Sequence, residues 1–301
     1  MTKKQKQKLI QYIVAIIIAL ATFIHEGYEK LTNNKVDREV TEQIENYENK
    51  LQVHYIDVGQ GDAILLVSPS KKTMLIDAGE NDDEELIVNY IKKQGIDKLD
   101  YVVGTHPHAD HIGGLDNVIR KLNIGDLYMP KVVHTTKTYE SVINEARKKD
   151  LKIKGAKAGV EFLLDEDISV SMFSPKESKY KELNNYSPIM KVTYKDTSFL
   201  FTGDAEREVE EEVIDAGYDI SANVLKVGHH GSTSSTTDKF LGKVNPSIAV
   251  IQVGKDNKYG HPHDETIKKL MDMGVEILRT DVNGDIILLS DGETLYKKVS
   301  K

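Results

Sequence analysis

Three histidines and one aspartate stand within six residues of the motif THPHADHIGG, at positions 105–114. His106 and His108 are two residues apart, so on an extended segment their side chains project to the same side and can chelate one metal ion. Asp110 and His111 follow directly and are placed to reach a second ion. Imidazole and carboxylate ligands suit zinc, and they suit manganese or iron where oxygen ligands dominate. The motif therefore predicts a metal site.

A predicted strand and a predicted helix flank this motif and must position it. Residues 99–104 read LDYVVG, which is typical of a short buried strand, and residues 115–122 carry apolar side chains at helical spacing. Gly113 and Gly114 allow the backbone to bend tightly beneath the histidines. A turn between strand and helix can direct several side chains toward one point.

Further candidate ligands and acid–base groups follow other predicted strands. Asp204 ends the apolar run SFLFTGD, where a carboxylate is costly unless it is paired or bound to metal, and we expect it to bridge two ions. His229 and His230 also close an apolar strand, and we expect only one of them to reach a metal. His261 and His263 lie in a later loop, where they are suited to phosphate binding or proton donation.

Composition fits a folded enzyme without disulfides. The chain has 301 residues, 39% of them hydrophobic, and no cysteine, so histidine and aspartate must hold any metal. Without its first thirty residues, which contain five lysines and two acidic residues, the chain has 35 basic and 46 acidic residues and a net charge of −11. This balance disfavours a surface for duplex nucleic acid but is compatible with a single strand passing a metal site.

The first 25 residues predict a membrane segment. Four lysines precede the apolar run at 9–24, which places them on the cytoplasmic side and everything after the run outside the membrane. We expect an uncleaved signal anchor in a single-pass protein. The alternative is a secreted protein whose signal peptide is cleaved after Ala21, in the A-x-A pattern of Ala19-Leu20-Ala21. Residues 26–50 are polar and predict a stalk, and residues 51–301 predict the globular domain.

The pattern from residue 51 onward predicts two half-domains of similar plan. Strands alternate with amphipathic helices, for example near 84–94, 205–216 and 264–273. The last two strands, 276–280 and 284–290, are predicted as neighbours around the turn Asn283-Gly284. We therefore expect an α/β (α+β) fold of the αββα type, two central sheets between two layers of helices.

These motifs, in this order, resemble the metallo-β-lactamase superfamily. HxHxDH followed by Gly-Gly is similar to its signature, and MLIDAG at 74–79, SFLFTGD at 198–204 and VLKVGHHGS at 224–232 are similar to its later strands. More narrowly, HYIDVGQGD at 54–62, HHGSTS at 229–234 and NKYGHPH at 257–263 resemble the hydrolase domain of ComEC competence proteins. A cell-wall phosphorylcholine esterase has a similar layout.

The resemblance implies a role for each motif residue. Metal ligands are expected at His106, His108, Asp110, His111, Asp204 and His229, with Asp57 and Asp77 orienting ligands. Catalytic roles are expected for Asp110, His230 and His261, and substrate contacts for Asn185, Ser187, Ser232 and His263. Many members have a third histidine where this chain reads LNNYS at 183–187. The ion held by His106, His108 and Asp204 is therefore expected to be bound more weakly than the other ion.

The implied cofactor is Zn²⁺, as two ions, with Mn²⁺ as an alternative. Two such ions roughly 3.5 to 4 Å apart activate water for attack on phosphorus or a carbonyl carbon. The run GSTSS at 231–235 offers donors for an anionic group, which favours a phosphodiesterase or nuclease acting outside the cytoplasm. Single-stranded nucleic acid and choline phosphodiesters are the expected substrates, and no obligate protein partner is evident. The alternatives are a wall or lipid-headgroup phosphorylcholine esterase, a non-catalytic metal-binding module and an iron redox enzyme.

Overall fold

The structure is a computed structural model that describes residues 47–177 and 179–301. The predicted membrane segment at 1–25 and most of the predicted stalk lie outside these described residues. Within the described residues, no helix combines the length and apolar character that a membrane span requires. Residues Asn49–Lys301 form one compact unit, and the fold below is the fold of that unit.

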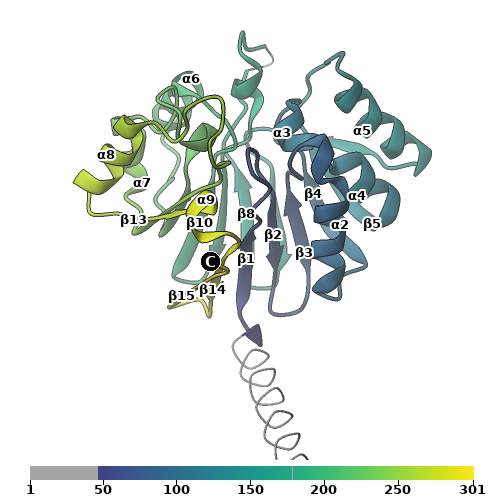
Figure 1. The fold of residues 1–301 in the computed structure, drawn as a ribbon, viewed down its shortest axis with the longest axis horizontal. Coiled ribbons are helices and arrows are strands. Elements are labelled where there is room, and N and C mark those ends of the chain that lie inside the picture. Colours follow the sequence, from purple (N-terminus) through teal and green to yellow (C-terminus); the bar gives the residue numbers. More distant parts are fainter. Residues whose placement is uncertain (1–46, 178) are drawn as a thin grey trace, which may run out of the picture. The chain divides into compact units, whose positions relative to one another are not determined.

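Two mixed β-sheets pack face to face, and helices cover the outer side of each (Figure 1). The eight-stranded sheet has the order β15 (Leu295–Val299), β14 (Ile286–Ser290), β1 (Leu51–Tyr55), β2 (Ile64–Val67), β3 (Thr73–Ile76), β4 (Lys98–Val103), β5 (Asn123–Met129), β6 (Ile153–Gly155). The seven-stranded sheet has the order β13 (Glu276–Arg279), β12 (Ile248–Ile251), β11 (Val224–Lys226), β10 (Thr197–Phe201), β9 (Met190–Tyr194), β8 (Ile168–Met172), β7 (Glu161–Asp165). This two-sheet α/β arrangement confirms the predicted fold class.

Alternate residues along the strands face two different cores. On β10, Phe199 and Phe201 pack between the two sheets, whereas Leu200 packs against the outer helices. On β2, Leu66 faces the core between the sheets and Leu65 faces the helices of the first sheet. Because side chains alternate along a strand and both faces are buried, these strands read as continuous apolar runs in the sequence.

Amphipathic helices form the two outer layers. Those packed on the first sheet are α2 (Glu84–Lys93), α4 (Leu115–Lys121) and α5 (Lys137–Lys148). Those packed on the second sheet are α6 (Arg207–Asp215), α7 (Asp238–Val244) and α8 (Asp264–Asp272). The predicted helices correspond to α2, α4, α6 and α8, with ends that differ by no more than two residues.

The prediction that the last two long strands are neighbours is wrong. β13 belongs to the second sheet and β14 to the first, and the short helix α9 (Thr280–Asn283) joins them. The Thr280 hydroxyl donates to the carbonyl of Val253 and accepts from its N–H, while the Asn283 side chain accepts the N–H of Arg279 at 2.9 Å. These bonds, one pair of which joins residues distant in sequence, favour a helical turn over a hairpin, so the chain crosses between the sheets here.

Parallel strand pairs determine where the site forms. β3 and β4 are parallel in the first sheet, and β10, β11 and β12 are parallel in the second. The predicted ligands follow the carboxyl ends of these strands, because Asp77 follows β3, the histidine motif follows β4, Asp204 follows β10 and His229 follows β11. Ligands bind characteristically at the carboxyl ends of parallel strands. The two sheets therefore deliver the candidate residues to one shared edge.

Candidate metal centre

The histidine motif leaves β4 and turns into one short helical turn, α3 (Ala109–Ile112). The N–H of Gly113 donates to the carbonyl of Gly79 at 2.9 Å. A Cβ atom at position 113 would overlap the backbone of Glu80 and Asn81. Glycine is required for this close approach, which packs the motif directly against the turn that follows β3.

Asp77 orients one of the motif histidines. It has a left-handed backbone conformation, with φ of 58°, and its carboxylate accepts the N–H and the hydroxyl of Thr105 at 2.8 and 2.7 Å. The same carboxylate lies 2.8 Å from Nδ1 of His111. A carboxylate on Nδ1 fixes the imidazole so that Nε2 presents its lone pair to a metal. The structure thus places Asp77 where the sequence predicted it.

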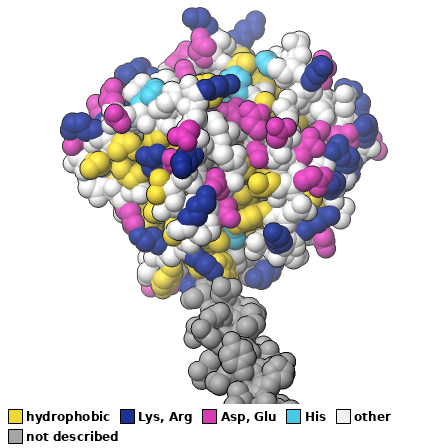
Figure 2. Space-filling model, viewed as in Figure 1, with side chains coloured by type: hydrophobic (Ala, Val, Ile, Leu, Met, Phe, Trp, Pro, Cys, Tyr) yellow, Lys and Arg dark blue, Asp and Glu magenta, His cyan; other side chains and the backbone are white. Residues whose placement is uncertain are grey.

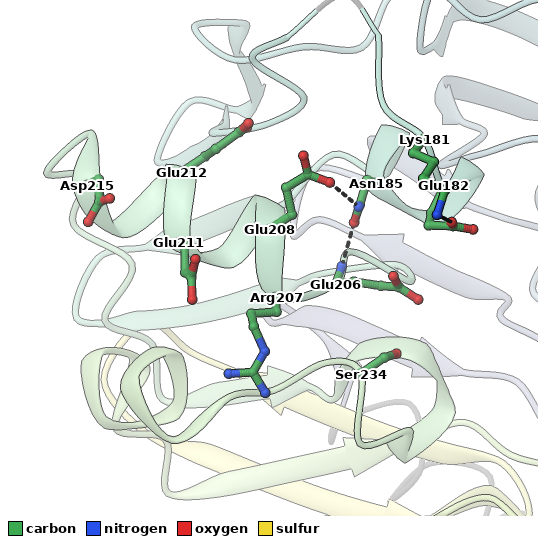
Figure 3. A pocket seen from close by; sticks show the side chains of 10 residues that line it. All are labelled: Lys181, Glu182, Asn185, Glu206, Arg207, Glu208, Glu211, Glu212, Asp215 and Ser234. Carbon is green, nitrogen blue, oxygen red and sulfur yellow. Dashed lines mark hydrogen bonds and ion pairs between the residues drawn. The ribbon is translucent and has the colours of Figure 1, made fainter.

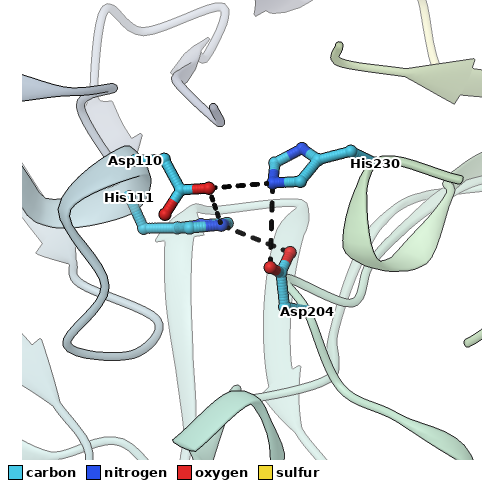
Figure 4. A group of neighbouring side chains, drawn as sticks. All are labelled: Asp110, His111, Asp204 and His230. Atoms are coloured by element: carbon cyan, nitrogen blue, oxygen red, sulfur yellow. Dashed lines mark ion pairs between the residues drawn. The ribbon is translucent and has the colours of Figure 1, made fainter. Parts of the chain in front are cut away.

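Four side chains from three loops converge on one point (Figure 4). Asp110, His111, Asp204 and His230 each offer a ligand atom, and these atoms all lie within 4.8 Å of one another. His111 Nε2 is 3.2 Å from Asp204 Oδ1, and His230 Nε2 is 3.4 Å from Asp110 Oδ2 and 3.7 Å from Asp204 Oδ2. Ligand atoms about 2 Å from a tetrahedral ion lie roughly 3.3 Å apart. The spacing therefore fits a bound cation.

Hydrogen bonding supports the same conclusion. His111 Nε2, His230 Nε2 and Asp204 Oδ1 are buried, yet none of the three has a hydrogen-bond partner. Buried polar atoms without partners are rare because they lose hydration without compensation. One divalent cation among these atoms would satisfy all three. The residues present therefore fit a metal ion.

His106 and His108 form a second set on the other side of Asp204. His106 Nε2 lies 2.9 Å from Nδ1 of His108 and 3.8 Å from Oδ2 of Asp204. The Nδ1 atom of His106 is within hydrogen-bond distance of the Ser187 hydroxyl, at 3.2 Å. Ligand atoms of both sets thus lie near the Asp204 carboxylate, as expected for a carboxylate that two ions would share.

The electrostatics of the site attract positive charge. Burial lowers the pKa of His106 well below its ordinary value and so favours the neutral form that binds metals. Burial also opposes protonation of His111, but Asp204, Asp77 and Asp110 raise its pKa well above the ordinary value. Burial likewise opposes ionisation of Asp204, but His111 and His230 hold its pKa well below the usual range. A metal ion can supply the positive charge that protons otherwise supply.

The geometry favours His230 over His229 as the ligand, the reverse of the sequence-based assignment. Both follow β11 in the turn η3 (Gly228–Gly231), with φ of 53° and 49°. His230 is 1% exposed, its Nδ1 bonds to the carbonyl of Gln252 at 2.9 Å, and its Nε2 faces the group in Figure 4. His229 is partly exposed, with Nε2 3.7 Å from Asp204 Oδ2 and Nδ1 3.1 Å from the Ser234 hydroxyl.

Asn185 and Ser187, predicted to contact substrate, support the ligands. Ser187 is fully buried, and its hydroxyl accepts the N–H of Asp204 at 3.2 Å and faces His106. Asn185 is nearly buried, accepts the N–H of Glu206 at 3.0 Å and donates to Glu208 at 2.9 Å. The turn η2 (Leu183–Tyr186) packs inward, so these side chains position Asp204 and the start of α6. Asn185 also lines the groove described below, and the substrate contacts of both residues stay a prediction.

A cavity of about 320 Å³ opens beside the metal-binding group. It is lined by Gln60, Glu80, His108, Ala109, Asp110, Asp204, His229, His230, Tyr259 and His261. The Nδ1 atom of His261 is buried without a hydrogen-bond partner, and burial together with the neighbouring histidines lowers the pKa of His261 to about 4. The structure therefore brings His261 to the site, as the sequence predicted.

The other two predicted substrate residues support this loop instead of lining the cavity. His263 Nδ1 accepts the N–H of Thr233 at 3.1 Å, and its ring packs edge-on against His261. The Ser232 hydroxyl is mostly buried and lies 3.1 Å from the Ser234 hydroxyl. Ser232 and His263 are thus not among the residues that line this cavity, and their substrate contacts stay a prediction. Ser234 is the hydroxyl of this run that reaches a site histidine.

An acidic groove adjoins His229 on the other side (Figure 3). It has a volume of about 720 Å³ and is lined by Lys181, Glu182, Asn185, Glu206, Arg207, Glu208, Glu211, Glu212, Asp215 and Ser234. Six of these ten residues are acidic and two are basic. Glu206 Oε1 lies 3.6 Å from Nδ1 of His229, which connects the groove to the metal centre. This part of the surface disfavours anionic groups.

Asp57 does not take the ligand-orienting role predicted for it. Its carboxylate accepts the N–H of Gly59 at 3.3 Å and pairs with the ammonium of Lys301 at 2.8 Å. Asp62, five residues later in the same motif, occupies the inner position instead. It is 2% exposed, and its Oδ1 lies 3.4 Å from Nδ1 of His230. Spacing alone did not distinguish the two aspartates, because the glycine-rich turn between them reverses the chain.

Asn184 is a second residue that the sequence did not single out. Its amide group lies 3.5 Å from Nδ1 of His229 and donates to Glu206 at 3.1 Å. It follows Leu183 at the place where many superfamily members have a third histidine. The place of this missing histidine pointed to both Asn184 and Asn185. The sequence alone did not show which of the two lies beside His229.

Comparison with known proteins identifies the family. The family model described as the metallo-beta-lactamase superfamily matches residues 56–255, a range that includes every ligand candidate described above. The chain therefore belongs to the metallo-β-lactamase superfamily, whose fold and histidine-aspartate site mark it as a metal-dependent hydrolase.

Its curated relatives include competence proteins. The chain is 32% identical over 252 residues to ComE operon protein 3 of Bacillus subtilis, covering 78% of this chain and 32% of that protein. It is 29% identical over 239 residues to Competence protein ComA of Neisseria gonorrhoeae, covering 79% of this chain and 32% of that protein. These matches confirm the resemblance to ComEC-like proteins. The chain spans about a third of the length of these relatives.

A solved structure shows the same fold. Tm1679, a metal-dependent hydrolase of the β-lactamase superfamily, superposes with a TM-score of 0.51 at 15% sequence identity, covering 76% of this chain and 95% of that chain. At this identity the similarity concerns the fold alone.

Proposed function

We propose that the protein is a phosphodiesterase that acts outside the cytoplasm, uses two divalent metal ions and cleaves single-stranded nucleic acid. The observation that carries the proposal is the position of Asp204. Its carboxylate lies 3.8 Å from His106, 3.2 Å from His111 and 3.7 Å from His230, so ligand atoms of both sets approach it. A carboxylate shared by two sets of nitrogen and oxygen ligands supports a dinuclear centre.

The residues present divide naturally between two ions. His106, His108 and Asp204 would hold one, and Asp110, His111, Asp204 and His230 would hold the other. The first set has fewer protein ligands, so we expect that ion to be bound more weakly. When bound, zinc or manganese supplies Lewis-acid polarisation of a phosphoryl oxygen and lowers the pKa of water.

Side chains around the cavity would bind and orient the substrate. His261 lines the cavity with an unpartnered Nδ1 and, being neutral at pH 7, can accept a proton or a hydrogen bond there. The hydroxyl of Ser234 lies beside His229 and can donate to an anionic oxygen. Tyr259 is 52% exposed at the same cavity and offers an aromatic face. Hydroxyl donors with an aromatic face suit a nucleotide better than a lactam.

Two observations support a single strand over a duplex. Figure 2 shows lysine and arginine side chains interspersed with acidic side chains on the visible face, without a continuous basic stripe. The net charge of the whole chain is −8. Duplex binding depends on clustered Lys and Arg contacts to phosphates. The name of one relative, Competence protein ComA, refers to competence and that of another, Recombination protein 2 of Haemophilus influenzae, to recombination, which favours nucleic acid as the substrate class.

The acidic groove supports a second candidate function. Its six acidic residues (Figure 3) include Glu206, which lies 3.6 Å from Nδ1 of His229, and they would attract a cationic group of the substrate. A choline phosphodiester combines a phosphoryl group with a quaternary ammonium, so a phosphorylcholine esterase of wall or lipid headgroups is the alternative.

Activity profiling with added Zn²⁺ or Mn²⁺ separates these functions. The purified protein would be assayed with single-stranded DNA, duplex DNA, RNA, p-nitrophenyl phosphorylcholine and nitrocefin. The proposal expects hydrolysis of single strands above duplex and no turnover of nitrocefin. Faster turnover of the choline ester would favour the second candidate. Metal binding without turnover of any substrate would contradict the proposal and favour a non-catalytic module.

A further inference from the structure

A lysine is buried beneath the metal-binding group, where the sequence pattern would place an apolar side chain. Lys226 is the last residue of β11 and is 0% exposed. Val224, two residues earlier, packs into the core between the sheets, whereas Leu225 and Val227 pack toward the outer helices. Because side chains alternate along a strand, Lys226 points inward between the sheets. Within the described residues, it is the only lysine in the buried class.

Asp62 is the counter-ion of this lysine. The ammonium of Lys226 lies 2.5 Å from Oδ2 of Asp62, which is itself 2% exposed. Burial opposes the charge on Asp62, but Lys226 and the neighbouring histidines hold its pKa below the ordinary value. A buried ion pair is costly to form and is weak evidence for stability. Stability alone therefore does not explain why this ion pair is present, which points to a role at the metal centre.

Asp62 contacts both the imidazole of His230 and the loop that carries Asp110. The other carboxylate oxygen of Asp62, Oδ1, lies 3.4 Å from Nδ1 of His230 and has no hydrogen-bond partner. The N–H of Asp62 donates to the carbonyl of Asp110 at 3.1 Å, and its carbonyl accepts the N–H of Gly79 at 2.9 Å. Asp62 therefore touches the loops that carry Asp110 and Asp77 as well as the imidazole of His230.

We propose that Lys226 and Asp62 are positioning residues that hold His230 and the Asp110 loop in the geometry of the second metal ion. This inference rests on the proposed dinuclear function. The Nδ1–H of His230 donates to the carbonyl of Gln252 at 2.9 Å. Lys226 holds one oxygen of Asp62 so that the other oxygen lies 3.4 Å from the same Nδ1 and adds electrostatic support for the orientation that directs Nε2 at Asp110 and Asp204. Lys226 also prevents Asp62 from acting as an unpaired carboxylate that would draw a metal ion away from Nε2.

The test measures metal affinity and stoichiometry in full-length variants by titration against a competing chelating indicator. Lys226→Met is expected to weaken one of the two ions at least about tenfold, because support around a ligand typically contributes 10- to 100-fold to affinity. Asp62→Asn is expected to weaken the same ion. The thermal transition of the metal-free proteins reports folding separately.

The double variant Lys226→Met/Asp62→Asn keeps the test falsifiable if a single variant does not fold. It leaves no unpaired charge in the core, so it is expected to fold. If the pair positions His230, the double variant still weakens one ion, and by no more than either single change, because both changes remove the same interaction. Two ions bound as in the wild-type protein would overturn the proposal.

A matched control isolates the site from general effects on the core. Asp116 is another mostly buried carboxylate, on α4, where it accepts a hydrogen bond from Ser141. Asp116→Asn is expected to leave both metal affinities within about twofold of wild type. If wild-type protein binds no metal at all, the proposed function fails. If wild type binds two ions and the double variant also binds both normally, only the positioning role fails.

Discussion

At the scale of single residues, Asp204 has the most consequential position. It is 2% exposed at the end of β10, and its oxygens lie 3.2 Å from His111, 3.7 Å from His230 and 3.8 Å from His106. The carboxylate accepts no hydrogen bond at Oδ1. A buried anion surrounded by imidazoles is stable only with compensating positive charge, so we expect metal binding to depend on this residue.

Substitutions of the neighbouring His229 and His230 are expected to differ in their effects on metal content and hydrolysis. His230→Ala removes an Nε2 that faces Asp110 and Asp204, so we expect loss of one metal ion and a fall in hydrolysis of roughly 100-fold or more. His229→Ala removes a partly exposed ring and is expected to keep both ions while lowering turnover less. Elemental analysis of both variants with activity in parallel checks this. Loss of an ion in His229→Ala, but not in His230→Ala, would restore the original assignment.

The sequence predicted the residue types of the site better than their individual roles. The histidine motif, Asp77, Asp204 and His261 all reach the site, because strand ends and a tight turn determined their direction. Asp62 was missed because only the fold shows that the turn after β1 directs it inward and Asp57 outward. The order of His229 and His230 depends on two left-handed residues in succession, which no periodicity reveals.

At the scale of elements, the buried side chain of His54 connects β1 to α2 through a hydrogen bond. His54 Nδ1 lies 2.9 Å from the hydroxyl of Tyr90, and Nε2 lies 3.2 Å from Oε1 of Gln52. Burial lowers the pKa of His54 from 6.5 to about 4. The sequence did not predict a site role for His54, and the structure places this residue in the packing between the first sheet and α2.

This histidine makes stability depend on pH. Between about pH 6.5 and pH 4 the unfolded chain binds a proton that folded His54 does not, so its contribution to the free energy of unfolding falls as pH falls. The loss is at most about 3 kcal/mol near pH 4. Urea unfolding at pH 7 and pH 5 should show a smaller pH effect in His54→Gln than in wild type. An identical pH effect in both proteins would contradict this origin.

Strand prediction succeeded where both faces of a strand are apolar and failed where a connection crosses between sheets. β10 follows from a largely apolar run, and the helices of the outer layers follow from their spacing. The crossing at α9 was misread as a hairpin, because Asn283-Gly284 has the composition of a two-residue turn. The bonds of Thr280 to Val253, distant in sequence, decide the conformation there.

At the scale of the whole molecule, the metal centre and the apolar N-terminal run are linked by topology. Every candidate ligand lies C-terminal to the run at 9–24, and four lysines precede that run. Under the positive-inside rule, this order of lysines and apolar residues predicts that the hydrolase domain lies on the outer side of the cytoplasmic membrane, as proposed above. The two sheets and their helices form one compact unit from Asn49 onward.

Protease accessibility checks this placement. If the domain lies outside the membrane as proposed, protease added to intact, wall-stripped cells should digest the hydrolase domain while a cytoplasmic marker stays whole. Release of a chain that begins at Thr22 into the medium would support a cleaved signal instead, and would still place the site outside. Full protection of the domain until the cells are lysed would contradict the proposed location.

The most direct test of the central claim counts metal ions and measures hydrolysis of single-stranded DNA in the same preparations of wild-type protein and Asp204→Asn. We predict two divalent ions per wild-type chain after reconstitution with Zn²⁺ or Mn²⁺, one of them more weakly bound. Asp204→Asn should lose at least one ion and roughly 100-fold or more of the activity, because both ligand groups share this carboxylate. A wild-type protein that binds no metal, or an Asp204→Asn variant that keeps both ions and full activity, would contradict the account.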